Sequence, residues 1–275
     1  MNKVLLQSEA DGLGQYIDDI TLLRIKSKRP ERFESLDNSC LISFDVYNIL
    51  ETKEPRAQLI IYFSKAHLFF ICENEKLREA VQNILNEYPE NDKTLLSFFN
   101  ELTKSDMEYM EKFEDRITTL EDNLLLGNKV HCAQKIVIFR KELIRLGKYY
   151  EPLDSIFEDL TQNEDGLISA TQIKSFIVLG NRLDRLHSTV LHLRDFVTQV
   201  REAYQEQIEI EQNGIMKIFT VITTIFAPLT LIVGWYGMNL HMPEYSWQYG
   251  YPLAIVLSLA VSIATIAAFK YKKWF

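Results

Sequence analysis

The chain has 275 residues, 47% of them hydrophobic, and a formal net charge of −8 at pH 7. This length can form one large domain or two small ones around a packed core. The acidic balance excludes nucleic acid as an expected partner, because phosphates require a basic protein surface. Residues 215–269 contain only Lys217 and Glu244 as charged side chains, so an acidic part is joined to an apolar part.

The first 91 residues alternate in the manner of a small α/β layer. A strand is predicted at residues 39–49. A hairpin is predicted from the sequences QLIIYF and HLFFIC, which lie on either side of residues 64–66. A helix is predicted at about residues 75–87. We therefore expect a cytoplasmic α/β domain over residues 1–91.

The next segment, residues 92–166, has a helical pattern. Asp92 is expected to cap a helix that runs to about Leu125, where a Gly-Asn pair breaks it. A second helix is expected to return from about Val130 towards Pro152. This predicts an antiparallel helical hairpin.

A very long helix is predicted from about Leu167 to Tyr236, a stretch whose only proline is Pro228. Apolar side chains recur in it at alternating steps of three and four, a spacing that packs one helix against others. These side chains are Phe176, Leu179, Leu183, Leu186, Val190, Leu193, Val197, Val200 and Tyr204. The pattern predicts a stalk helix over residues 167–214 that continues into a membrane span.

Two apolar segments are long enough to cross a bilayer. Residues 215–236 carry only Lys217 as a charge, and the 18 residues 252–269 carry none. A helix of 18 residues rises about 27 Å, which is close to the ~30 Å thickness of the hydrocarbon core. Aromatic side chains gather at the junction like an interfacial belt, which favours two spans over a buried hairpin. They are Trp235, Tyr236, Tyr245, Trp247, Tyr249 and Tyr251.

The basic residues predict the orientation of the spans. The connecting loop, residues 237–251, has no Lys or Arg, whereas residues 270–275 include Lys270, Lys272 and Lys273. Both termini are therefore expected in the cytoplasm of a multi-pass cell-membrane protein. The cysteines are scattered and odd in number, as expected of reduced cytosolic thiols. They are Cys40, Cys72 and Cys132.

One face of the long helix changes character where it enters the first span. Its acidic part comprises Asp195, Gln199, Glu202, Glu206 and Glu209. Its small and polar part, here called the polar stripe, comprises Asn213, Met216, Thr220, Thr223, Ala227, Thr230 and Gly234. The polar stripe suits either a close helix–helix contact or the wall of a water-filled path. The acidic part favours the path, because aligned acids repel at a packed interface but attract cations around an axis.

Two spans cannot enclose a pore, so several copies must surround an axis if the polar stripe lines one. In that arrangement Glu202, Glu206 and Glu209 form stacked rings, here called the acidic funnel; the alternative is a solvated helix face. The opposite face of the span is expected to contact lipid or the second span. It comprises Ile218, Ile222, Ile225, Leu229 and Ile232.

The junction of the two spans carries a specific motif. Tyr236-Gly237-Met238-Asn239 is followed by Met242-Pro243-Glu244, and Asn213-x-x-Met216-Lys217 lies upstream. Placed after a stalk helix and between two spans, this pattern resembles the CorA magnesium transporter family. The resemblance is strongest over about residues 160–275 and extends in outline to the whole chain.

The resemblance implies an α+β fold and a funnel-shaped homopentameric cation channel whose first spans line the pore. It implies Mg²⁺ as the transported ion and as a regulator in the cytoplasm. Gly237, Met238 and Asn239 are similar to the external selectivity element, whose neutral oxygens can hold Mg²⁺ through its water shell. The other implied pore residues are Thr230 and Asn213 as polar rings and Met216 with Phe219 as the apolar gate.

The sequence also departs from the family's pattern. His241 lies near the position after the signature where an acidic residue is common, and the loop is one residue shorter. Glu244 is therefore its only carboxylate. Ala227 stands where many members are bulkier, which widens the middle of the pore. The soluble part is short for the family, so only Asp165 and Asp184 are named as candidates for the inhibitory magnesium sites.

Other interpretations have less support. Residues 161–172 resemble a calcium loop, but Thr161 and Gln172 stand where acidic ligands are needed, so a turn is expected. No Ser-His-Asp, Walker or dinucleotide pattern occurs, so we expect no enzyme. A Zn²⁺, Co²⁺ or Ni²⁺ transporter of the same architecture is one alternative, against which Met238 favours Mg²⁺. A membrane-anchored scaffold is the other.

Overall fold

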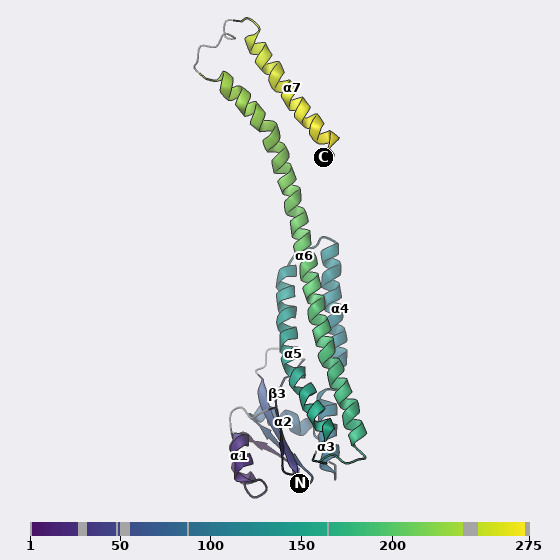
Figure 1. Ribbon diagram of the computed structural model, residues 1–275. Helices are drawn as coiled ribbons and strands as arrows, with labels where there is room; N and C mark the ends of the chain where they lie inside the picture. Colours follow the sequence, from purple (N-terminus) through teal and green to yellow (C-terminus); the bar gives the residue numbers. More distant parts are fainter. Residues whose placement is uncertain are drawn as a thin grey trace. The chain divides into compact units, whose positions relative to one another are not determined.

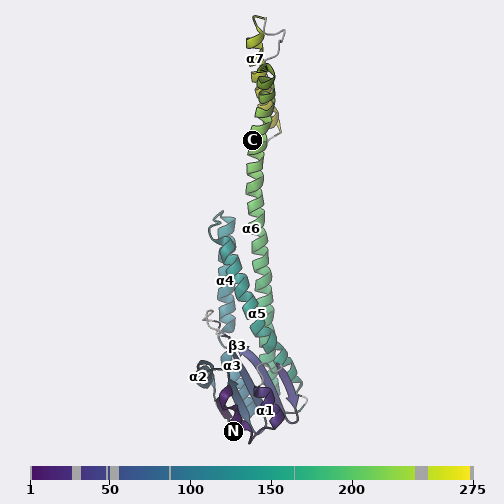
Figure 2. The ribbon, with the colours of Figure 1, turned by 90° about the vertical axis from the view of Figure 1, so that its left-hand side faces the viewer.

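The computed structural model describes residues 2–26, 32–47, 49, 56–86, 88–163, 165–238 and 247–272. It divides into two units, residues 1–201 and residues 202–275. The first unit holds a five-stranded sheet and most of the helices, and the second holds the end of helix α6 together with helix α7 (Figures 1 and 2).

The sheet is antiparallel except at one edge. Its strands are β1 (Asn2–Leu6), β2 (Phe33–Leu36), β3 (Ser39–Val46), β4 (Ala57–Ser64) and β5 (Leu68–Cys72), in the order β1-β5-β4-β3-β2. Among the strands that the structure describes, only β1 and β5 are parallel neighbours. The strand predicted at residues 39–49 is confirmed as β3, which ends at Val46, and the predicted hairpin is confirmed as β4 with β5.

The helices occupy most of the remaining described chain. They are the 3-10 helix η1 (Gln7–Leu13) and the α-helices α1 (Asp19–Lys26), α2 (Glu75–Ile84), α3 (Asn91–Leu102), α4 (Asp106–Leu125), α5 (Cys132–Gln162), α6 (Ile173–Tyr236) and α7 (Gly250–Tyr271). The predicted α+β class is confirmed, and α2 confirms the helix expected after the hairpin.

Both faces of the central strands are buried, which explains their continuous apolar sequences. One face, with Ile60 and Phe69, packs against Leu13 of η1 and Ile25 of α1. The other face begins a chain of aromatic contacts described next.

Aromatic rings connect the sheet to the helices. The ring of Phe44 on β3 lies 5.7 Å from that of Phe99 on α3. Phe99 in turn lies 4.9 Å from Phe157 on α5, and Phe157 lies 6.0 Å from Phe176 on α6. The sheet and three helices therefore share one core.

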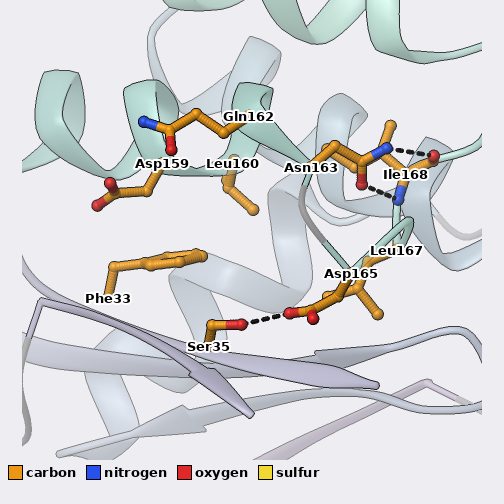
Figure 3. Close-up of a pocket in the computed structure, with 9 residues that line it drawn as sticks. All are labelled: Phe33, Ser35, Asp159, Leu160, Gln162, Asn163, Asp165, Leu167 and Ile168. Atoms are coloured by element: carbon orange, nitrogen blue, oxygen red, sulfur yellow. Dashed lines mark hydrogen bonds between the residues drawn. The ribbon is translucent and has the colours of Figure 1, made fainter. Parts of the chain in front are cut away.

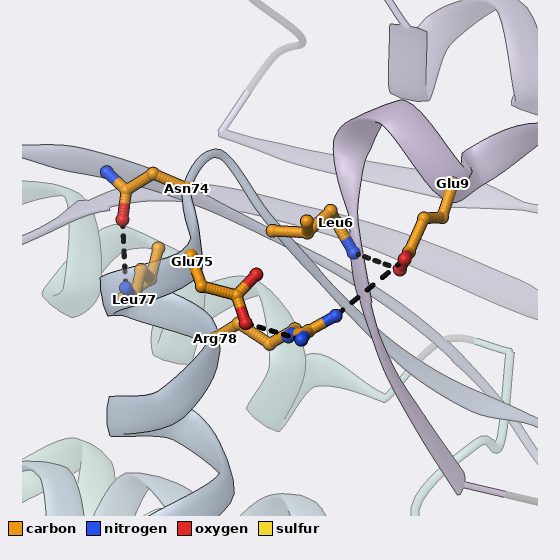
Figure 4. Close-up of polar contacts among 6 residues, drawn as sticks. All are labelled: Leu6, Glu9, Asn74, Glu75, Leu77 and Arg78. Carbon is orange, nitrogen blue, oxygen red and sulfur yellow. Dashed lines mark hydrogen bonds and ion pairs between the residues drawn. The ribbon is translucent and has the colours of Figure 1, made fainter.

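A set of polar contacts joins the first strand to α2 (Figure 4). Asn74 accepts a backbone N–H and caps α2. Arg78 pairs with Glu75 and lies 3.7 Å from Glu9, whose carboxylate accepts the backbone N–H of Leu6. These contacts tie the end of β1 to the helix that follows β5.

The single helix predicted to start at Asp92 is wrong, because the chain forms two helices, α3 and α4. The break lies at Thr103, whose hydroxyl donates to the Phe99 carbonyl at 2.9 Å and whose own carbonyl accepts from Arg182 of α6. Side-chain bonds of this kind compete with helix continuation. Asp92 lies inside α3, and its carboxylate accepts from the backbone N–H of Ser169 at 3.0 Å.

The helix end predicted near Pro152 is also wrong, because α5 continues to Gln162. A proline inside a helix costs about 3 kcal/mol. Leu153, Ile156 and Phe157 are buried beyond it. Since each such side chain contributes about 1.5–3 kcal/mol on burial, packing outweighs the lost hydrogen bond.

The apolar seam predicted on α6 is buried from Phe176 to Val200. Helices α4 and α5 run beside this part of α6 in both views (Figures 1 and 2). His187 on α6 places its Nδ1 3.3 Å from Oδ2 of Asp154 on α5. The seam is thus filled within one chain. Its helix begins at Ile173, a few residues later than predicted.

Asp106 is a buried carboxylate at the start of α4, with 6% of its surface exposed. The hydroxyl of Tyr150 on α5 donates to its Oδ2 at 2.8 Å. Burial raises the pKa of Asp106 from 3.8 to about 6, and the Tyr150 hydrogen bond and the charge of Arg182 oppose this rise. The charged form of Asp106 is therefore penalised in the fold.

We expect Asp106→Asn to stabilise the full chain above pH 6 by about 1–3 kcal/mol. The carboxyl group of Asp106 binds its proton more tightly in the folded state than in the unfolded state. The protonated carboxyl therefore contributes its full stability below about pH 4, and this contribution is lost as the pH rises to about 6. The melting-temperature difference between variant and parent in detergent should grow across that window and then level off. Asp115→Asn, on the exposed side of α4, should show no such step, and a pH-independent difference for Asp106→Asn would contradict the assignment.

Candidate functional site

The second unit consists of two apolar helical segments with little cover. Both α6 and α7 are long and apolar enough to cross a membrane, and only 6% and 0% of their most apolar windows are buried. Soluble proteins rarely expose contiguous apolar patches of this extent. The exposure argues against a buried core hairpin and agrees with two membrane spans.

Helix α7 covers one side of the α6 segment. Val221 is buried, and Ile225, Leu229 and Ile232 are partly buried. An apolar groove of about 580 Å³ separates the two helices towards their connection, with Ile232 on one side and Leu259 on the other. Part of the apolar face predicted to meet lipid or the second span therefore faces α7.

The polar stripe lies on the side of α6 that α7 leaves open. Each of its members, Asn213, Met216, Thr220, Thr223, Ala227, Thr230 and Gly234, is exposed. The stripe therefore remains available for water or for other copies of the chain.

Two hydroxyl groups of the polar stripe, those of Thr220 and Thr230, are arranged as acceptors. Thr220 donates its hydroxyl proton to the carbonyl of Met216 at 2.8 Å, and Thr230 donates to the carbonyl of Phe226 at 2.8 Å. A hydroxyl whose proton is committed in this way presents only lone pairs to its surroundings. Such oxygens suit a cation or its hydration water.

The acidic funnel is exposed as well. Glu202, Glu206 and Glu209 form no ion pair with any residue that the structure describes. Like charges three and four residues apart on a helix repel one another by a few tenths of a kcal/mol per pair, roughly 0.2–0.5 kcal/mol. A nearby cation would relieve this repulsion.

Helix α6 ends directly before the signature. The N–H of Gly237 donates to the carbonyl of Val233 at 2.8 Å. A Cβ atom at Gly237 would lie 2.9 Å from that carbonyl oxygen, so a larger residue could not fit without a shift of the backbone. Met238 is exposed, while Asn239, His241 and Glu244 lie outside the described residues.

The two candidate regulatory carboxylates occupy separate places in the first unit. Asp165 lines a small cavity of about 90 Å³ between β2 and the end of α5, where it accepts from the hydroxyl of Ser35 (Figure 3). Asp184 lines a groove between α5 and α6. Among the described residues no cluster of three or more His, Cys, Asp or Glu side chains is suited to a metal ion. The sequence-based prediction that they bind Mg²⁺ stays a prediction.

The segment that resembles a calcium loop is a turn in the part that the structure describes. The side chain of Asn163 accepts from the N–H of Ile168 and donates to its carbonyl, both at 2.9 Å (Figure 3). Its amide is therefore committed to the backbone and is not directed at a metal ion.

The profile of the family described as "CorA-like Mg2+ transporter protein" matches residues 16–273. The chain belongs to this family. It is a family of transporters, not of enzymes, and the two candidate spans agree with a place in a membrane. The resemblance read from the signature and its surroundings is confirmed.

Individual CorA proteins are similar over part of their length. The Cobalt/magnesium transport protein CorA of Thermotoga maritima is 30% identical over 184 residues, which are 66% of this chain and 52% of that protein. The Magnesium transport protein CorA of Haemophilus influenzae is 31% identical over 191 residues, covering 60% and 58%. The chain thus spans about half the length of the curated relatives it matches.

The fold is shared over almost the whole chain. The complete structure of the CorA magnesium transporter of Methanocaldococcus jannaschii superposes with a TM-score of 0.76 at 24% identity, covering 98% of this chain and 88% of that one. The full-length CmaX protein gives a TM-score of 0.73 at 17% identity. The CorA architecture of a sheet domain, a long helix and a second apolar helix is therefore established here.

Proposed function

We propose that the chain is the subunit of a homopentameric channel that mediates Mg²⁺ uptake across the cell membrane, with both termini in the cytoplasm. The observation that carries the proposal is the uncovered polar stripe on α6, which continues from the acidic funnel. Membership of a family described by Mg²⁺ transport supports the choice of ion.

Each group of residues along the proposed path has its own role. The oxygens of Gly237, Met238 and Asn239 hold the hydrated ion at the outer mouth. Mg²⁺ dehydrates reluctantly, so neutral oxygens can select it through its water shell. The threonine hydroxyls of the polar stripe then accept from this water, and Met216 with Phe219 closes the cytoplasmic end.

Cytoplasmic Mg²⁺ gates the proposed channel. Abundant internal Mg²⁺ holds the subunits together in the closed state, and falling Mg²⁺ loosens their contacts. Asp165 and Asp184 are candidates for this regulation because both are accessible from grooves of the first unit.

Ion flux in proteoliposomes tests the function. The purified full chain should admit Mg²⁺, and Mg²⁺ should compete better than Co²⁺, Ni²⁺ or Zn²⁺. Preferred flux of one of the other ions would identify a transporter of that ion with the same architecture. No flux of any of these ions would leave the scaffold interpretation.

The acidic funnel predicts a salt-dependent conductance. Changing Glu202, Glu206 and Glu209 together to Gln should lower Mg²⁺ flux severalfold at low salt, because the rings concentrate cations. The loss should be smaller near 1 M salt, where the Debye length is about 3 Å. Exchanging Glu111 and Glu114, exposed on α4, for Gln provides the control. Unchanged flux of the triple variant at every ionic strength would show that these carboxylates face away from the path.

A further inference from the structure

Two grooves of opposite charge flank the exposed side of α6 in the first unit. The cationic groove, about 420 Å³, lies between α3 and α6 and contains Lys174, Arg182 and Arg185 beside Leu96 and Val178. The acidic groove, about 330 Å³, lies between α5 and α6 and contains Asp154, Glu158 and Asp184 beside Ile177 and Asn181. Among the described residues, no carboxylate lines the cationic groove. No Lys or Arg lines the acidic groove.

The two grooves lie at the same level of α6. Residues at steps of three and four share a helix face, which puts Lys174, Val178 and Arg185 together. Ile177 and Asp184 belong to the neighbouring face by the same rule. Ile177 and Val178 are 44% and 67% exposed and form an apolar ridge between the grooves. Each copy of the chain therefore carries a cationic and an acidic surface side by side.

The charges of both grooves are largely uncompensated within one copy. Lys174, Arg185, Glu158 and Asp184 are exposed and form no ion pair in the part of the chain that the structure describes. Arg182 differs, because it already donates to a backbone carbonyl. The protein has a net charge of −8, yet this groove is lined by three cationic side chains and no acidic one. Such a lining favours the binding of an anionic surface.

We propose that the cationic groove of one copy contacts the acidic groove of the next copy. The contact rests on the proposed function, since it belongs to the same oligomer. A ring of identical subunits uses a head-to-tail contact, which requires two different and complementary surfaces on each subunit. The grooves supply both surfaces, and the contact covers the ridge of Ile177 and Val178.

In this contact the cations of the next copy replace Mg²⁺ as the partner of Asp184, one of the two carboxylates named above as candidates for regulation. The cations of the neighbouring copy neutralise Asp184 and Glu158 directly, so assembly through these grooves does not require Mg²⁺. Opposite charges placed across an interface also fix its register, because like charges face one another and repel in the wrong register.

A charge exchange within one chain tests the contact. Arg185→Glu and Asp184→Arg should each raise the apparent dissociation constant of the full-length oligomer in detergent about tenfold. The double variant carries both reversals on every copy and should return to within about twofold of the parent, since complementarity is restored. Mass photometry over a dilution series measures the assembled fraction. Lys135→Glu, exposed near the start of α5 and outside both grooves, is the control and should leave assembly unchanged.

Three outcomes would overturn the contact. They are single reversals that assemble as tightly as the parent, a double variant as weak as the sum of its singles, and parent assembly through this site that appears only when Mg²⁺ is added. The last outcome would assign the acidic groove to the metal instead. Mg²⁺ flux of the parent is measured separately, so loss of the proposed function and loss of this contact are distinguishable.

Discussion

Replacing Asn239 by Ala should abolish Mg²⁺ uptake while the oligomer stays assembled. In the proposed pentamer, each copy contributes one side-chain amide oxygen to the water shell of the entering ion. A hydrogen bond between uncharged groups contributes about 1 kcal/mol, so loss of the amide oxygen from every copy in the ring should reduce uptake at least about 100-fold. Radioactive or fluorescent Mg²⁺ uptake in proteoliposomes measures this loss.

The control for this variant is another amide of the same connecting segment. Gln248 is exposed and lines the groove between the two apolar helices, so Gln248→Ala should keep most of the uptake. Native mass measurements confirm that both variants assemble. Near-normal uptake by an assembled Asn239→Ala protein would contradict the selectivity role.

Replacing Met216 by Ser should produce a channel that leaks at high internal Mg²⁺. Met216 and Phe219 are 61% and 63% exposed on one copy, so their side chains are free to form apolar rings around an axis. Narrow apolar rings stop ions because water leaves them, and a hydroxyl would hold water in the constriction. We expect flux at closing Mg²⁺ concentrations to rise at least about tenfold, as the closed constriction no longer dries.

A neighbouring residue separates gating from a general loss of packing. Ile215 is 54% exposed and precedes Met216 on α6, but it does not belong to the polar stripe. Ile215→Ser therefore makes a similar apolar-to-polar change off the predicted path and should remain closed. If Met216→Ser stays as tightly closed as the parent, the constriction lies elsewhere.

Much of the candidate path was predictable because its signals are local. A long uncharged run identifies a span, and steps of three and four identify one helix face. These rules placed Thr220 and Thr230 on one stripe, and both are exposed in the structure. They could not show that each hydroxyl proton is committed to a backbone carbonyl, since that depends on the rotamer in the folded helix.

Composition and periodicity encode burial, so the sequence alone was enough to predict two apolar helices long enough to cross a membrane, a central β-hairpin and a long helix with a buried seam. Which elements cover the buried faces depends on the tertiary structure. The seam of α6 is filled by α4 and α5 of the same chain, and β1 joins the sheet edge beside β5. The tertiary structure also determines the break at Thr103, because its backbone carbonyl accepts a hydrogen bond from Arg182, 79 residues away in the sequence. A periodic pattern states that a face is buried, whereas its partner is chosen by contacts between residues far apart in the sequence.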